Sequence, residues 1–193
     1  IASGDEDASR ILLRRIAAGD EDSLRTLFEV FGQRMYAYAL RLVNDPSTAD
    51  DVLQESLVAV WKSAKRFRGD GRVIAWLLGI IHHKALNHLR RKPHQSLDSD
   101  EENMETKLTN NNPTVQEQII RSEQQRLLRN GLDALSLEHR MVIELVFYQG
   151  LSLAETAEVC GCPVGTVKSR LNYAKSSLRG ILNRAGVHEE DIQ

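Results

Sequence analysis

Residues 150–178 carry the stretch that decides the fold, GLSLAETAEVCGCPVGTVKSRLNYAKSSL. Ser152 and Glu155 have the spacing of a capping box, which predicts a short helix that ends at Gly161. Pro163 suits the first turn of a second, longer helix. A short helix, a tight turn containing glycine and a basic helix together predict a helix-turn-helix, a motif that places its second helix in the major groove of DNA.

The second helix has one apolar stripe, formed by Val164, Val167, Leu171, Ala174, Leu178 and Leu182. The residues one step around the helix are expected to face outward toward base edges: Lys168, Ser169, Asn172 and Tyr173. Lysine can recognise guanine, asparagine can bind adenine through two hydrogen bonds, and hydroxyls adapt to several bases. Three further residues are better placed for phosphates: Thr166, Arg170 and Lys175. The alternative is an ordinary helical hairpin with a solvated polar face.

Charge is strongly segregated along the chain, although the net charge of the 193 residues is only −2. Residues 62–92 hold nine lysines and arginines against one acid, and residues 163–184 hold five against none. Between these blocks, residues 94–118 hold six acids against one lysine. Two basic blocks separated by an acidic stretch predict two surfaces that face a polyanion, joined by a linker that avoids it. Two solvated faces are the alternative.

The polar, acidic and asparagine-rich segment 93–113 shows no helical or strand periodicity and marks a domain boundary. We expect an all-α protein of two small helical domains joined by a flexible linker, because ~70 to 85 residues per domain favour a helical bundle. The expected divisions are a disordered tail 1–9, an N-terminal domain 10–93, an acidic linker 94–114, a C-terminal domain 115–185 and an acidic tail 186–193.

Apolar residues at helical spacing predict the helices of both domains. In the first domain, a long helix with a stripe from Leu24 to Leu42 ends near Pro46, and the next begins at Ser47, whose spacing to Asp50 suggests a capping box. A third helix covers residues 74–89.

In the second domain, a helix over about residues 115–135 precedes one that Ser136 caps. The inner face of this second helix is expected to comprise Val142, Ile143, Val146 and Phe147. Gly150 is expected to end it.

Several classes of protein are disfavoured. The longest apolar run, residues 73–81, is far below the ~20 residues of a membrane-spanning helix. The acidic N-terminus lacks the features of a signal peptide, so we expect a cytoplasmic protein. Cys160 and Cys162, the only cysteines, cannot form a disulfide framework and are expected to be packed thiols.

The histidines of the third helix do not form a convincing metal site. His82 and His83 are adjacent and point apart on a helix, and His88 is poorly aligned with His83. We therefore expect no metal, no cofactor and no enzymatic activity, and a metal-dependent hydrolase is the weakest hypothesis.

Three segments together resemble the extracytoplasmic-function group of bacterial RNA polymerase sigma factors. The helix-turn-helix, with GLSLAETA at 150–157 and PVGTVKSRL at 163–171, resembles the promoter-binding C-terminal region of that group. DDVLQESLVAVW at 50–61 resembles its polymerase-binding helix, and AWLLGIIHHKALNHLRR at 75–91 its promoter-melting helix. The resemblance spans about residues 10–185 in the right order, linker included.

The resemblance implies a sigma factor that binds core RNA polymerase, recognises the minus-ten and minus-thirty-five promoter elements and is held inactive by an anti-sigma factor. The residues implied in binding core polymerase are Asp50, Asp51, Gln54 and Glu55. Those implied in binding minus-ten DNA are Arg66, Phe67, Arg68, Arg72, Trp76, Asn87, Arg90 and Arg91. The resemblance also implies that the minus-thirty-five element is bound by the outward and phosphate-facing residues of the final helix, which are named above.

A stand-alone helix-turn-helix regulator, with the first domain as a dimerisation or sensor module, is the competing hypothesis. Such a regulator should bind duplex promoter DNA tightly by itself, whereas a sigma factor should bind it poorly without polymerase.

Overall fold

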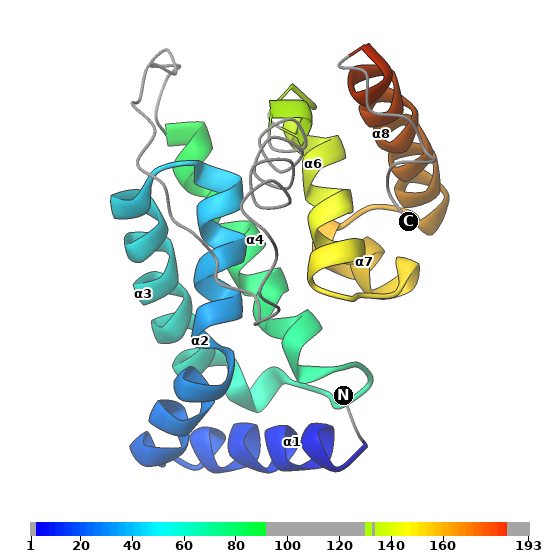
Figure 1. Cartoon of the computed structure of the whole chain (residues 1–193). Helices are drawn as coiled ribbons and strands as arrows, with labels where there is room; N and C mark the ends of the chain where they lie inside the picture. The colour runs from blue at the N-terminus through cyan, green and yellow to red at the C-terminus, as the bar shows by residue number, and fades with distance from the viewer. Residues whose placement is uncertain (1–2, 92–129, 133, 185–193) are drawn as a thin grey trace, which may run out of the picture.

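The computed structural model describes residues 3–91, 130–132 and 134–184, and every regular element in these ranges is a helix (Figure 1). The N-terminal half consists of α1 (Ser3–Ala17), α2 (Glu21–Val43), α3 (Pro46–Ser63), the short 3₁₀ helix η1 (Ala64–Arg66) and α4 (Val73–Arg91). The C-terminal half contains α6 (Leu137–Ile143), the π-helical turn η2 (Glu144–Tyr148), α7 (Leu153–Cys160) and α8 (Val164–Arg184). The predicted all-α class is confirmed. The expected linker 94–114 and most of the expected helix 115–135 lie outside the described residues.

Helix α3 is capped by a different residue from the one that the sequence predicted. Asn44 ends α2 in the left-handed conformation, with φ at 51°. Asp45 is the N-cap of α3: its carboxylate accepts a hydrogen bond from the backbone N–H of Thr48 at 2.8 Å, and Pro46 occupies the first turn. The predicted capping box at Ser47 is therefore wrong, because an aspartate before an N-terminal proline already satisfies the helix end.

The N-terminus also differs from the prediction. Residues 3–9, expected to be a disordered tail, begin α1, which crosses one end of the bundle in Figure 1. The Glu6 carboxylate accepts a hydrogen bond from the backbone N–H of Val73 at 2.8 Å. Val73 is the first residue of α4, whose N–H has no partner within that helix. Further along α1, Leu13 and Ile16 are buried, so the whole helix is tied to the fold.

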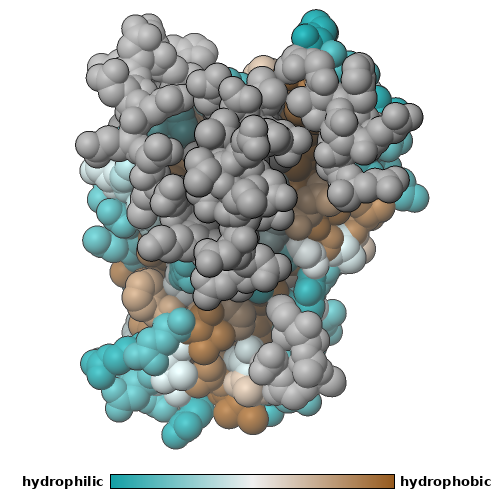
Figure 2. Space-filling model, in the orientation of Figure 1, coloured by the Kyte–Doolittle hydropathy of each residue, from teal (hydrophilic) through white to brown (hydrophobic). Residues whose placement is uncertain are grey.

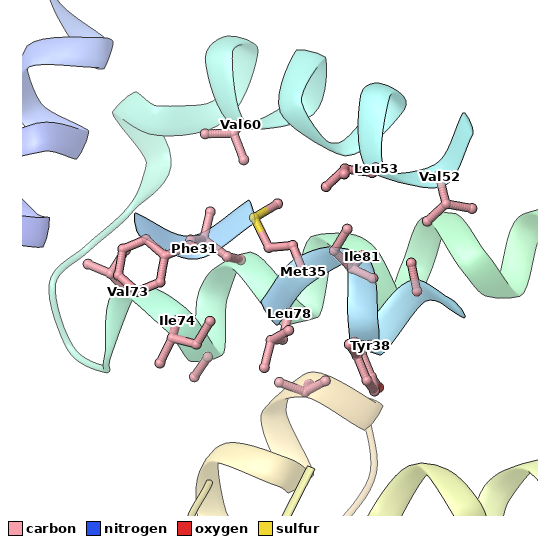
Figure 3. Packing of buried hydrophobic residues seen from close by; sticks show 14 of the residues in the cluster. Phe31, Met35, Tyr38, Val52, Leu53, Val60, Val73, Ile74, Leu78 and Ile81 are labelled. Carbon is pink, nitrogen blue, oxygen red and sulfur yellow. The ribbon is translucent and has the colours of Figure 1, made fainter. Parts of the chain in front are cut away.

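The main core lies between α2, α3 and α4. Figure 3 shows their labelled side chains converging on one cluster, with Tyr38 at the edge nearest the C-terminal half. Met35, Leu78 and Ile81 are fully buried there. The same cluster continues into the C-terminal half through Met141, Leu145, Leu151 and Val159. The two halves therefore share one apolar core, and burying each such side chain contributes about 1.5–3 kcal/mol.

The helix-turn-helix forms as predicted. Ser152 and Glu155 make both hydrogen bonds of a capping box, and Gly161 ends α7 with φ at 61°. A second cluster joins α6, α7 and α8 and includes Val142, Ile143, Ala157, Val167, Leu171 and Ala174. In the orientation of Figure 2, hydrophilic residues lie along the outer edges of the molecule and hydrophobic ones gather nearer its middle.

Phe147 is an exception to the predicted inner face. Its side chain is 57% exposed, whereas Val142 and Ile143 are buried. Residues 144–148 form a π-helical turn, which holds more residues than an α-turn and so rotates the following side chains away from the expected stripe. Within the described residues, no helix is both long and apolar enough to cross a membrane.

A polar pair lies inside the main core. The Tyr38 hydroxyl and His82 Nδ1 are 2.9 Å apart, and both side chains are almost completely buried. Burial, with a smaller contribution from the neighbouring His83, lowers the pKa of His82 to about 4 from its usual 6.5. His82 is therefore neutral in the folded protein at neutral pH.

This pair predicts a loss of stability in mild acid. The unfolded chain protonates His82 at its ordinary pKa of 6.5, whereas the folded chain resists protonation down to about pH 4. Stability is thus complete above pH 6.5 and falls by roughly 3 kcal/mol as the pH drops to 4. His82→Gln should flatten this decline in urea-unfolding measurements, and His83→Gln, an exposed neighbour, should not. An equally steep decline in His82→Gln would contradict the assignment.

Candidate nucleic-acid interface

Helix α8 presents the outer face that its stripe predicted. Val167, Leu171 and Ala174 are buried against α6 and α7, whereas Val164, also predicted for the stripe, is 39% exposed at the first residue of the helix. On the opposite side the side chains of Lys168, Ser169, Asn172 and Tyr173 are exposed, as expected. The Ser169 hydroxyl donates a hydrogen bond to the backbone carbonyl of Thr166 within the helix, at 3.0 Å. A polar face opposite a buried stripe can enter a groove of DNA without disturbing the core.

The two basic residues predicted to reach phosphates have partners within the chain. Arg170 is half-buried, and its guanidinium lies 2.5 Å from the carboxylate of Glu138 in α6. The ammonium of Lys175, which is exposed, lies 5.2 Å from the centre of the Phe147 ring. A cation at this distance from an aromatic face is attracted to it only weakly when solvated. Lys175 is therefore easily released to a phosphate, whereas Arg170 must leave an ion pair.

His139 of α6, which the sequence analysis did not select, borders the same face. Its ring stacks on that of Tyr173, with ring centres 4.4 Å apart and planes inclined by 24°. The hydroxyl of Ser136 lies 2.7 Å from His139 Nδ1. No local spacing signals this contact, because it depends on how α6 packs across α8.

The residues assigned to minus-ten DNA by resemblance lie on η1, the following loop and α4. Arg66 and Arg68 are exposed, and between them Phe67 packs against Trp76 with ring centres 5.5 Å apart. Both rings are partly buried against the main core, so each contributes to packing. The remaining predicted residues, Asn87, Arg90 and Arg91, are exposed on the last turns of α4.

Arg72 is bound by the helix-turn-helix of its own chain. Its guanidinium donates to both carboxylate oxygens of Glu155, at 2.5 and 2.9 Å, and to the backbone carbonyl of Gly150 at 2.8 Å. Burial disfavours the charged form of Glu155, but hydrogen bonds from Arg72 and Ser152 outweigh it and hold the pKa of Glu155 at about 2. In this arrangement Arg72 is not open to DNA.

Two arginines of α2 extend the same contact. Arg34 donates to the backbone carbonyl of Gln149 at 2.8 Å and to its side-chain oxygen at 3.3 Å. The guanidinium of Arg41 lies 5.3 Å from the centre of the Tyr148 ring. Together with the shared apolar core, these contacts hold the two halves of the chain in a closed arrangement.

One residue of the acidic face predicted to bind polymerase, Glu55, is engaged by side chains of α4. Asp50, Asp51 and Gln54 are exposed on α3. Glu55 instead receives Lys84 and His88 of α4, each at 3.1 Å, and hydrogen bonds from these two residues lower its pKa. Three of the four predicted residues are thus exposed on this face, and the fourth, Glu55, is engaged by α4.

Cys160 is a half-buried free thiol, and Cys162 is free as well. Burial, assisted by Cys162, raises the pKa of Cys160 to about 12, so this thiol is unreactive at neutral pH. Among the described residues, no three histidine, cysteine, aspartate or glutamate side chains gather closely enough to hold a metal ion.

Two family models match the chain in the order of the two predicted domains. Residues 27–94 match Sigma-70 region 2, and residues 131–180 match Sigma-70 region 4. The ECF RNA polymerase sigma factor SigL of Mycobacterium tuberculosis is 30% identical over 172 residues, covering 89% of this chain and 95% of SigL. The chain belongs to the ECF RNA polymerase sigma factors. It is therefore a promoter-specificity subunit of RNA polymerase, as the resemblance indicated, rather than a stand-alone regulator.

Further comparisons support the assignment of this sigma factor to the family. ECF RNA polymerase sigma factor SigK of Mycobacterium bovis is 29% identical over 185 residues, covering 94% of this chain and 95% of SigK. The structure of CnrH in complex with the cytosolic domain of CnrY matches with a TM-score of 0.67 and 26% identity, covering 92% of this chain and 99% of CnrH. RpoE of Bartonella quintana, solved with the anti-sigma factor NepR, shares the fold, with a TM-score of 0.61 and 24% identity, over 82% of this chain and 96% of RpoE.

Proposed function

We propose that this sigma factor recognises the minus-thirty-five element through α8, recognises the minus-ten element through η1, the following loop and α4, and binds core polymerase through Asp50, Asp51 and Gln54 of α3. The observation that carries this assignment is the exposed polar face of α8 above its buried stripe. We place the domains at residues 10–93 and 115–185, joined by the linker 94–114. The sigma factor has no catalytic activity of its own and acts in the cytoplasm, where polymerase is found.

In the closed arrangement, the two halves of the chain cannot bind both promoter elements at the same time. Elements about 25 base pairs apart are separated by about 85 Å of duplex, at roughly 3.4 Å per base pair. A compact chain of 193 residues has a radius of gyration of only about 16 Å. Binding to polymerase must therefore part the two halves and release Arg72 from Glu155. Run-off transcription with purified core polymerase tests the assignment, and tight binding of the free protein to duplex promoter DNA would contradict it.

An anti-sigma factor would act on this closed form. The similar chain CnrH was solved in complex with the cytosolic domain of CnrY. We infer that the present sigma factor likewise binds a partner protein, an anti-sigma factor that contacts both halves and masks their binding faces. A screen of neighbouring gene products in the transcription assay should yield such an inhibitor, and a screen in which none blocks transcription would count against it.

Base recognition and phosphate binding on α8 should respond differently to substitution. Asn172→Ala removes a side chain able to make two hydrogen bonds to a base, so it should change the preferred base at one minus-thirty-five position, with about 1–3 kcal/mol less discrimination. Lys175→Ala should weaken all promoters alike and reduce the logarithmic salt slope by about one. Transcription from a library randomised across the element measures both effects.

Arg170→Ala should weaken promoter binding less than Lys175→Ala does. Its ion pair with Glu138 makes its effect on affinity smaller, because DNA must first displace that carboxylate. A change of base preference in Lys175→Ala but not in Asn172→Ala would show that α8 is rotated differently in the groove.

A further inference from the structure

Tyr173 is the largest side chain on the outer face of α8 and is 62% exposed. One face of its ring is nevertheless covered by His139, whose ring is nearly parallel at 4.4 Å. The Ser136 hydroxyl, 2.7 Å from Nδ1, fixes the orientation of His139 in turn. The side chains of Ser136, His139 and Tyr173 are therefore in successive contact, and they connect the start of α6 to the outer face of α8.

A second contact runs beside the first. Glu138, adjacent to His139, pairs with Arg170, which lies three residues before Tyr173 and so on the same side of α8. The first turn of α6 thus holds two neighbouring side chains of α8 by different means. Arg170 is held by charge, and Tyr173 is held by ring stacking.

Stacking matters for an exposed side chain that must contact a base. An unsupported tyrosine loses rotamer freedom when it binds, and that loss weakens the contact. A stacked pair of rings is favourable beyond the area it buries, so the position of Tyr173 is fixed before DNA arrives. With one ring face covered, the ring edge and the hydroxyl remain to meet a base edge or a thymine methyl group.

We propose that His139 is a positioning residue for minus-thirty-five recognition, holding Tyr173 in the orientation in which it contacts one base pair. This rests on the proposed function, because it requires α8 to lie in the major groove. It also assigns a part in promoter specificity to α6, outside the recognition helix.

The test is transcription by holoenzyme from a library randomised across the minus-thirty-five element. Tyr173→Ala and His139→Ala should relax the preference at the same base position, the latter by about two- to tenfold. The double variant should be no worse than Tyr173→Ala alone, since His139 acts through that ring. His139→Phe, which keeps an aromatic ring, should restore the preference. Thermal unfolding of each variant establishes that it is folded.

Glu138→Gln is the matched control. It removes the neighbouring ion pair but leaves the stacked rings, so the preferred base should not change. His139→Lys supplies charge without a ring, and restoration by this variant but not by His139→Phe would overturn the proposal in favour of a phosphate contact.

Two other outcomes separate this proposal from the proposed function. An unchanged preference in Tyr173→Ala or His139→Ala, beside an altered one in Asn172→Ala, would overturn the role of His139 alone. Unchanged preferences in all three variants would overturn both the role of His139 and the assignment of α8 to the element.

Discussion

Arg34→Ala is expected to shift the chain toward an open arrangement in which its two halves are apart. Arg34 makes two hydrogen bonds to Gln149, which is buried, and both bonds are partly shielded from solvent. Hydrogen bonds to a charged group contribute about 1.5–3 kcal/mol, so the ratio of open to closed molecules should rise by about 10- to 100-fold. Small-angle X-ray scattering of the full chain should record a larger radius of gyration.

Arg25→Ala is the matched control, because it makes the same change on the same helix. Arg25 is 76% exposed and pairs with Asp22 across one helical turn, at 3.6 Å. Its removal should leave the scattering unchanged, since exposed pairs contribute little. Identical scattering from Arg34→Ala and the unaltered chain, at equal thermal stability, would show that the apolar contacts alone maintain the closed form.

Asp51→Arg is expected to abolish binding to core polymerase. Asp51 is exposed on α3 beside the buried Val52 and Leu53, so the substitution leaves the core intact. Reversing a charge opposite a basic partner places like charges together, which costs several kcal/mol, and the affinity should fall by more than about 100-fold. Co-purification and a binding titration at fixed salt measure the loss.

Glu29→Arg provides the control for this charge reversal, because Glu29 is an exposed acid on α2 outside the proposed polymerase face. Glu55→Arg is unsuitable, since Glu55 also holds Lys84 and His88 and its loss would perturb the packing of α3 on α4. Equal recovery of polymerase with Asp51→Arg and Glu29→Arg would place the polymerase contact elsewhere.

Local signals explain what the sequence could predict. The capping box at Ser152, the left-handed glycine at 161 and the stripe through Val167 and Leu171 each act within a few residues. They define the helix-turn-helix and the outward face of α8 without knowledge of the rest of the chain. The same holds for α4, whose apolar residues at helical spacing predicted a helix over residues 74–89.

The interface between the halves could not be predicted in this way. Arg72 and Glu155 lie far apart in the sequence but are in contact in the structure. A basic loop has the same sequence pattern whether its arginine binds DNA or a carboxylate of its own chain. The π-helical turn that exposes Phe147 also has no simple pattern, because it breaks the period on which the inner face was predicted. The sequence analysis also missed His139, because its contact with Tyr173 depends on how α6 packs across α8.

The guanidinium of Arg72 can serve one partner at a time, and this has a consequence for competition among sigma factors. Under the proposed function, polymerase captures only the open molecules, so its apparent dissociation constant is the intrinsic one divided by the open fraction. A cell that holds several sigma factors and a limited supply of polymerase would then share that supply according to how often each one opens. The contact between Arg72 and Glu155 would thereby help to set the rank of this sigma factor among its rivals, even where its surface fits polymerase as well as theirs.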